Sequence, residues 1–224
     1  MQMKVWDLPL RLFHWLLAVT VTGALVTVSL GGNWMLWHER FGLAVLGLLV
    51  FRLVWGCIGS THARFASFFP TPGRLLAHFR GHWHGPGHTP LGALSVLAML
   101  ALFSFQAISG LFATDDIAFS GPLARQVSSA LSSDMSRWHR WTEELIYLLI
   151  ALHLAAILVY RLRGKRLVAA MLHGRKEADA EAKPVKGGGW LALGIAVVIA
   201  VAAVYAASGA WIPAPAPLPA TPAW

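Results

Sequence analysis

Histidines are the residues whose number and position in this sequence most clearly suggest chemistry. The chain has 224 residues and ten histidines, and six of the ten lie in or beside polar links. The other four fall inside long apolar segments, where an ionisable side chain is costly and usually functional. These four are His14, His38, His139 and His153.

His139 and His153 have the most informative spacing. They stand in an i, i+14 relation in one apolar segment. In an α-helix, such residues differ by roughly 40° in direction and roughly 21 Å in height. Both imidazoles therefore face one side of the helix, one near each surface of a membrane. One metal ion cannot reach both rings, so the spacing predicts two cofactors stacked across the bilayer.

Each of these histidines needs a second ligand at its own depth. Because consecutive spans run in opposite directions, His14 is expected level with His153 on the inner side, and His38 level with His139 on the outer side. Two neutral imidazoles that face each other suit a b-type haem, whose iron they hold axially. Zinc would require three or four ligands, and a carboxylate di-metal site would require acidic residues on several helices. We therefore expect two bis-histidine haem b groups.

Composition places these histidines in a membrane protein. Hydrophobic residues make up 57% of the chain and charged residues 12%, against about 45–50% and about 25% in soluble domains. Five segments reach the roughly 20 apolar residues that span a bilayer as a helix. Their expected bounds are Leu8–Leu30, Trp37–Ile58, Leu91–Phe112, Trp138–Tyr160 and Trp190–Ala207. The lone Cys57 excludes a disulfide framework, an iron–sulfur cluster and a covalently attached c-type haem.

The expected fold is all-α: a transmembrane four-helix haem-binding bundle followed by a fifth, C-terminal transmembrane helix. Residues 1–176 form the expected four-helix domain, and residues 177–224 form a linker, the fifth helix and a periplasmic tail rich in Pro and Ala. Phe65–Arg80 has an apolar face with interspersed arginines and is expected along the cytoplasmic interface. Gly121–Ser133 is expected to form a short amphipathic helix outside, and Pro184–Gly189 a flexible hinge.

Lysine and arginine set the expected orientation. Most of the 18 basic residues lie in the N-terminal segment and in the links after spans two and four, and the net charge is +8. Such residues stay in the cytoplasm, so the N-terminus is expected there and the C-terminus outside. We assign this charge to topology and to contact with anionic membrane lipid, and we expect no nucleic-acid partner.

Arg52 is a cation inside the second span, and it stands in the same i, i+14 relation to His38. It is expected at the depth of the inner histidine pair, where a haem propionate or a quinone headgroup would be a suitable partner. Alternatively, its side chain extends to the cytoplasmic surface. The sequence leaves both interpretations open.

Two further groups of residues carry weaker signals. Small residues near the expected ligands let either a flat cofactor or a neighbouring helix approach closely. These residues are Gly42, Gly47, Ala151, Ala155 and Ala156. Four link histidines suit either a metal site or a solvated loop. They are His78, His82, His84 and His88.

The motifs around the four span histidines resemble the bacterial cytochrome b561 family, which includes the b-type membrane subunits of nickel–iron hydrogenases. The resemblance covers about residues 5–176. It rests on VWDLPLRLFHW around His14, WHERFGLAVLGLLVFRLVWG from His38 through Arg52, GHTPLGAL before span three, and WHRWTEELIYLLIALHLAA with His139 and His153. It implies a bacterial inner-membrane bundle in which these histidines hold two b haems. The fifth span and a third span without histidine depart from the family pattern.

Three functions remain open. The first is a transmembrane electron conduit between a quinone, such as ubiquinone, and a periplasmic redox partner, such as a cytochrome c. The second, suggested by a family relative, is a superoxide:quinone oxidoreductase. Arg40, Arg137 and Arg140 beside the outer pair would then attract the anion, or they would instead bind propionates. The third is a haem-free transporter or scaffold. Whether the chain is itself an enzyme stays open, and a homo-oligomer is compatible with the sequence.

Overall fold

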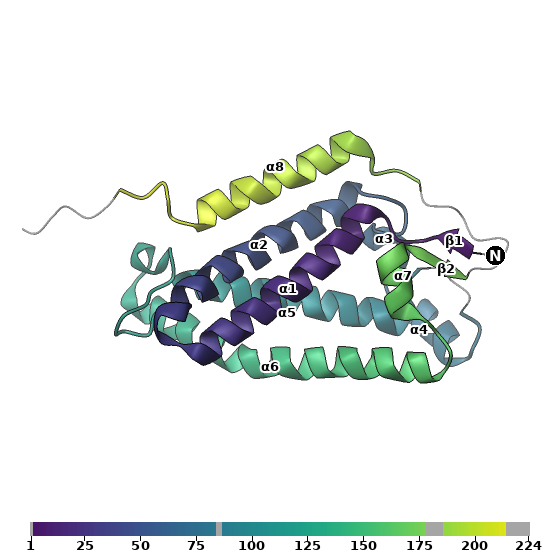
Figure 1. Cartoon of the computed structure of the whole chain (residues 1–224), viewed down its shortest axis with the longest axis horizontal. Coiled ribbons are helices and arrows are strands. Elements are labelled where there is room, and N and C mark those ends of the chain that lie inside the picture. Colours follow the sequence, from purple (N-terminus) through teal and green to yellow (C-terminus); the bar gives the residue numbers. More distant parts are fainter. Residues whose placement is uncertain (1, 84–86, 178–185, 214–224) are drawn as a thin grey trace, which may run out of the picture.

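Five long helices dominate the architecture (Figure 1). The computed structural model describes residues 2–83, 87–177 and 186–213. The long helices are α1 (Leu8–Leu30), α2 (Met35–Ile58), α5 (Pro90–Phe112), α6 (Ser129–Leu162) and α8 (Gly189–Ala207). All five are long and apolar enough to cross a membrane. The all-α fold with four bundle helices and a fifth C-terminal helix is thereby confirmed.

Short elements connect the long helices. They are β1 (Gln2–Lys4), η1 (Gly32–Trp34), α3 (Phe65–Phe68), α4 (Pro72–Phe79), η2 (Ala124–Gln126), α7 (Leu167–His173) and β2 (Arg175–Glu177). The expected interfacial segment after α2 consists of α3 and α4, and Pro70 separates the two helices. β1 and β2 pair antiparallel, with Met3 opposite Lys176. Such short strands have no clear periodicity, so the sequence did not predict them.

The N-terminal end of α6 differs from the expectation. The helix starts at Ser129 rather than Trp138, because the side chain of Ser128 accepts a hydrogen bond from the backbone N–H of Leu131 and caps the helix there. No proline or glycine interrupts the polar residues that follow. The expected separate helix over Gly121–Ser133 is therefore wrong: this stretch holds η2 and the first turn of α6.

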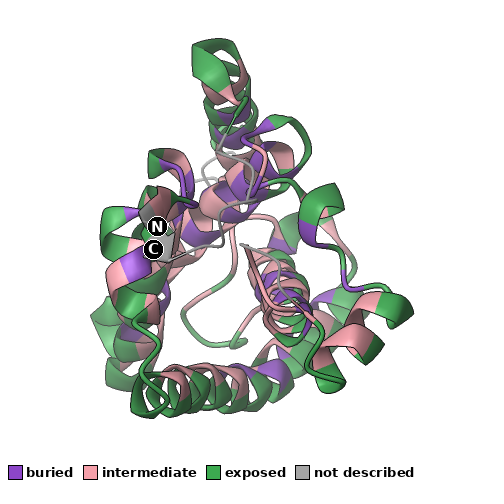
Figure 2. Ribbon diagram, turned by 90° about the vertical axis from the view of Figure 1, so that its right-hand side faces the viewer, coloured by how far each residue is buried: buried purple, intermediate pink, exposed green. Residues whose placement is uncertain are grey.

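The bundle consists of two hairpins joined through α2. α1 packs on α2 and α5 packs on α6, while α2 also packs on α5. Gly31 and Gly32 turn the chain between α1 and α2 with φ angles of 65° and 53°, which glycine adopts without strain. Figure 2 views the bundle from one end; α6 lies along its lower edge and is mostly exposed. Its apolar exposed face is suited to lipid.

The fifth long helix packs on the back of α2. Ala196 and Ala200 of α8 are buried. A Cβ atom added at Gly47 of α2 would lie only 2.7 Å from the side chain of Val204. Small residues on both helices thus let the two backbones approach closely. Gly47 serves helix packing rather than a cofactor.

The segment before α8 is attached to the bundle. The backbone N–H of Thr61 donates to the carbonyl of Lys186 at 2.8 Å. A Cβ atom at Gly188, whose φ is 87°, would lie 2.9 Å from the Trp55 ring. Lys186 and Gly188 of the expected hinge Pro184–Gly189 therefore contact the end of α2. Residues 184 and 185 lie outside the described part of the chain, as does the expected tail from residue 214 onwards.

Asp7 ties the start of α1 to the end of α2. Its carboxylate is buried. One oxygen accepts from the backbone N–H of Leu10 at 2.7 Å and caps α1. The other accepts from the indole N–H of Trp55 at 3.0 Å and from the hydroxyl of Ser60. One side chain therefore fixes the hairpin at the end where β1, β2, α3, α4 and α7 gather (Figure 1).

We predict that Asp7→Ala destabilises the protein by roughly 2–4 kcal/mol, because it removes a helix cap and leaves the buried Trp55 donor unpaired. Thermal unfolding of the purified protein in detergent measures the effect. Thr89→Ala is the matched control, because Thr89 caps α5 through the single N–H of Gly92. An equal loss of stability in both variants would contradict the role of Asp7 as a tie between helices.

Candidate functional site

The four span histidines meet in two pairs between the hairpins. The ring centroids of His14 on α1 and His153 on α6 are 6.4 Å apart. Those of His38 on α2 and His139 on α6 are 6.1 Å apart. All four side chains are partly buried. The structure therefore brings together the same partners that the depth argument pairs.

These separations fit a metal ion held between two imidazoles. A bond of about 2.0–2.1 Å from each ring nitrogen to the metal leaves the ring centroids roughly 6 Å apart. Among the described residues, no group of three or more His, Cys, Asp or Glu side chains could hold a metal. The donor set at each level is thus two neutral nitrogens, which suits an axially ligated haem iron better than zinc.

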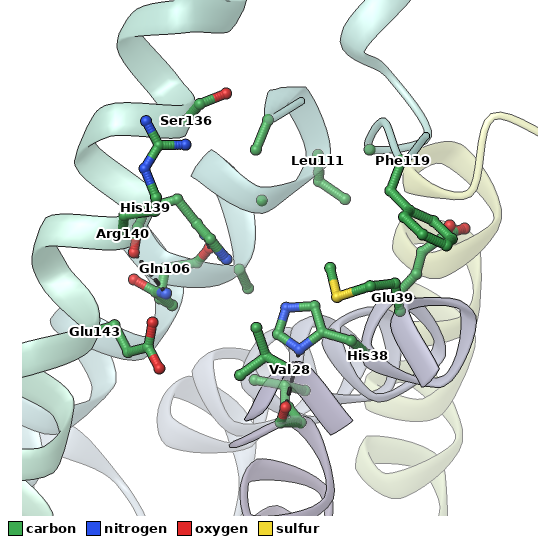
Figure 3. Close-up of a pocket in the computed structure, with 18 of the residues that line it drawn as sticks. Val28, His38, Glu39, Gln106, Leu111, Phe119, Ser136, His139, Arg140 and Glu143 are labelled. Atoms are coloured by element: carbon green, nitrogen blue, oxygen red, sulfur yellow. Dashed lines mark hydrogen bonds between the residues drawn. The ribbon is translucent and has the colours of Figure 1, made fainter. Parts of the chain in front are cut away.

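A cavity of about 300 Å³ lies beside the His38–His139 pair, and both histidines line it. Figure 3 shows His38 and His139 on opposite sides of it. Gly42, one turn after His38, lines the cavity and has open space where a Cβ atom would be. A Cβ atom at Gly110 would lie 2.8 Å from the His139 ring. The small residues thus leave room for a flat group beside the ring of His38 and let the ring of His139 rest against the α5 backbone.

Hydrogen bonds orient both outer rings. Nδ1 of His38 lies 2.9 Å from the carbonyl oxygen of Ala24, and Nδ1 of His139 lies 3.0 Å from that of Gln106. A carbonyl only accepts, so each Nδ1 carries the proton and donates it. Nε2 of each ring is left with a lone pair that can bind a metal. Ligating histidines in metalloproteins typically have this second hydrogen bond.

Three polar residues that hold His139 were missed in the sequence. The side chain of Gln106 donates to the carbonyl of His139 at 2.9 Å and accepts from the hydroxyl of Thr142. The hydroxyl of Ser109 lies 3.2 Å from Nδ1 of His139. Gln106 is the one amide side chain in this span, whose other polar side chains are serines. A polar amide in an apolar span is a signal that would have identified it.

The surroundings of the His14–His153 pair differ from those of the His38–His139 pair. Nδ1 of His14 is buried and has no hydrogen-bond partner among the described residues. Arg52 is only 1% exposed, and neither Nη1 nor Nη2 finds a partner there. This burial excludes the interpretation in which Arg52 extends to the cytoplasmic surface. Its guanidinium carbon instead lies 4.6 Å from the ring centroid of Phe65.

The structure places the small residues of α6 and the link histidines in different surroundings. Ala151, Ala155 and Ala156 are exposed on α6. Among the link histidines, His82 is exposed, while His88 packs between the rings of Trp6 and Phe68, 4.6 Å and 4.5 Å away. His84 lies outside the described residues. The described residues of this link form no metal cluster.

A loop held together by Asp115 lines part of the cavity. Oδ1 of Asp115 accepts from the backbone N–H groups of Phe119, Ile117 and Ala118, each at 2.9 Å. These hydrogen bonds lower the pKa of the Asp115 carboxyl, so it stays ionised near neutral pH. Asp115 and Phe119 line the cavity from this loop, and Figure 3 shows Phe119 beside it.

Comparison with known proteins agrees with this site. The model of the prokaryotic cytochrome b561 family matches residues 5–174, which include all four span histidines and Arg52. Neither the search of curated proteins nor the search of solved structures found a match to this chain. α8 lies beyond the matched region. The chain belongs to the prokaryotic cytochrome b561 family and is a membrane b-type cytochrome that takes part in electron transfer.

Proposed function

We propose that this chain holds two haem b groups and carries electrons across a bacterial inner membrane between the quinone pool and a periplasmic redox partner, such as a cytochrome c. The observation that carries the proposal is the pair of imidazole–imidazole separations, 6.4 Å and 6.1 Å, both made with α6. His14 and His153 would be the ligands of the inner haem. His38 and His139 would be those of the outer haem.

The protein contributes position and electrostatics to this function. When bound, haem b supplies reversible one-electron oxidation and reduction. The two histidines of each pair would hold one haem iron between them. The i, i+14 spacing on α6 sets the two levels roughly 21 Å apart along the helix. The rings of His38 and His139 are held by backbone carbonyls, so the outer site is oriented in advance.

The distribution of charge supports the proposed orientation. The N-terminal segment, the α2–α5 link and the segment after α6 lie at one end of the bundle (Figure 1). These segments contain most of the lysine and arginine, so this end would face the cytoplasm and its anionic lipid. The His38–His139 pair would then lie on the periplasmic side. The exposed apolar faces of the helices would give a quinone access from the lipid.

The superoxide alternative gains no support from the outer cavity. Arg137 pairs with Asp134, and the guanidinium of Arg40 lies 4.8 Å from the ring centroid of Trp37. Only Arg140 of the three expected arginines lines the cavity, together with three carboxylates. These carboxylates belong to Glu39, Asp115 and Glu143. Such a balance does not favour an anion. A haem-free transporter or scaffold is not compatible with membership of a b-type cytochrome family.

We predict two haems per chain in the purified protein. Because each haem would need both of its ligands, His14→Ala or His153→Ala removes the inner haem alone, and His38→Ala or His139→Ala removes the outer one alone. The haem-to-protein ratio from reduced-minus-oxidised absorption spectra should fall from two to one in each variant.

The exposed His173 provides the matched control. His173→Ala should keep both haems. A double variant that lacks both histidines of one pair, such as His14→Ala with His153→Ala, should have the same haem-to-protein ratio as either single variant. A wild-type ratio of one would contradict the two-haem proposal, as would single variants that all retain two haems.

We predict that Gln106→Leu weakens the outer haem selectively. The change removes the side-chain hydrogen bonds to the His139 carbonyl and to Thr142. Loss of such supporting contacts typically lowers metal affinity about 10- to 100-fold. Haem retention during dilution in detergent measures the effect. Ser104→Ala on the same helix, outside the cavity lining, should behave as wild type. Equal retention in Gln106→Leu would show that these contacts do not support His139.

A further inference from the structure

Arg52 is the largest fully buried side chain in the described part of the protein. A guanidinium inside a membrane-spanning helix is costly unless an anion or acceptor satisfies it. Nη1 and Nη2 are buried and have no hydrogen-bond partner among the described residues. The guanidinium therefore has unsatisfied hydrogen-bond donors in a buried position, where an unsatisfied donor costs free energy.

The neighbouring carboxylate does not meet this need. Asp7 is close enough to act on Arg52 electrostatically. Its oxygens, however, already accept from Leu10, Trp55 and Ser60. The ion pair found among the described residues joins Arg137 and Asp134, so Arg52 and Asp7 form none there. Asp7 thus offsets part of the charge from a distance and leaves the guanidinium donors available.

Aromatic rings cover the guanidinium and orient it. Its central carbon lies 4.6 Å from the ring centroid of Phe65 and 5.9 Å from that of Phe68. Cation–π contacts of this kind favour the cation but use none of its N–H groups. The planar donor edge therefore stays free for an oxygen ligand, and a guanidinium binds carboxylate with two parallel hydrogen bonds.

Arg52 lies at the level of the inner histidine pair. The spacing from His38 to Arg52 on α2 equals the spacing from His139 to His153 on α6. Since His38 and His139 face each other, equal spacing along two helices brings Arg52 to about the level of His153. Equal spacing also places Arg52 within roughly 40° of the direction of His38, toward the interior of the bundle.

We propose that Arg52 binds a carboxylate of the cofactor held by His14 and His153, namely a propionate of the inner haem, and thereby raises the reduction potential of that haem. This inference rests on the two-haem function proposed above. The positive charge would stabilise the reduced state, which carries one positive charge fewer at the iron. A quinone carbonyl is the other oxygen that could accept from Arg52, and the test below distinguishes the two.

The expected effect follows from the lost charge. By Coulomb's law, a unit charge roughly 12 Å from a redox centre, at an effective dielectric constant of about 20, changes the reduction equilibrium constant of that centre about tenfold. We therefore expect Arg52→Gln to lower the reduction equilibrium constant of the inner haem about tenfold, which corresponds to about 59 mV for one electron. Arg52→Lys keeps the charge and should hold the potential closer to the wild-type value.

Potentiometric titration of the full-length protein tests the proposal. His14→Ala, which retains the outer haem, identifies which of the two potentials belongs to the inner site. Arg80→Gln is the matched control, because Arg80 is an exposed cation at the same end of the bundle. The expected result is a downward shift of the inner potential in Arg52→Gln alone. The outer potential should stay constant in every variant.

Several results would overturn the proposal. One is an unchanged inner potential in an Arg52→Gln protein that holds two haems. If quinone reduction is lost while both potentials stay constant, the acceptor is a quinone carbonyl and the propionate assignment is wrong. In either case the two-haem function stands. A wild-type protein with fewer than two haems would instead refute that function itself.

A second measurement covers the case in which Arg52→Gln does not fold. Wild-type full-length protein is reconstituted with haem dimethyl ester, whose propionates carry no charge. At each site, the affinity for haem is divided by the affinity for the ester. The proposal predicts that this ratio is at least tenfold larger at the inner site than at the outer site. Equal ratios at the two sites would overturn it.

Discussion

Opposed imidazoles at two depths are the constraint on which this architecture depends. A ring on α6 meets a ring on α1 at one level and a ring on α2 at the other. This is possible only if α1 and α2 run antiparallel, with their histidines at opposite ends, and if α6 is long enough to reach both. The tight turn at Gly31–Gly32 meets the first condition, and the 34 residues of α6 meet the second. The bundle geometry is thus largely a consequence of where four side chains must be.

The polar contacts at the two ends of the bundle differ in kind. At one end, Gln106, Ser109 and Thr142 hold His139, and a loop built on Asp115 lines the cavity. At the other end, Asp7 joins α1 to α2, while the Arg52 guanidinium lies against aromatic rings. The His38–His139 pair is therefore fixed by neutral hydrogen bonds. At the other end, the buried polar group is the Arg52 cation instead.

Periodicity and hydropathy were enough to predict the five spans and the histidine pairs, because each depends only on distance along a helix. The direction of the Arg52 side chain could not be predicted from periodicity, because a long side chain can either extend to water or fold inward. Packing of the guanidinium against Phe65 decides between the two. The role of Asp7 depends on Trp55 and Ser60, which lie a whole hairpin further along the chain. The roles of two glycines on α2 also depend on which element packs beside each of them. Gly42 lines the cavity, while Gly47 faces α8, which lies outside the four-helix bundle.

The position of α6 in the chain has a consequence for biogenesis. This helix supplies one histidine to each pair, and it is the last of the four bundle helices to be synthesised. Neither pair is complete while only α1, α2 and α5 have entered the membrane. Any cofactor that needs both rings must therefore be captured after α6 has been inserted. A chain that stops short of this helix lacks both sites rather than one, so the two are gained together during assembly.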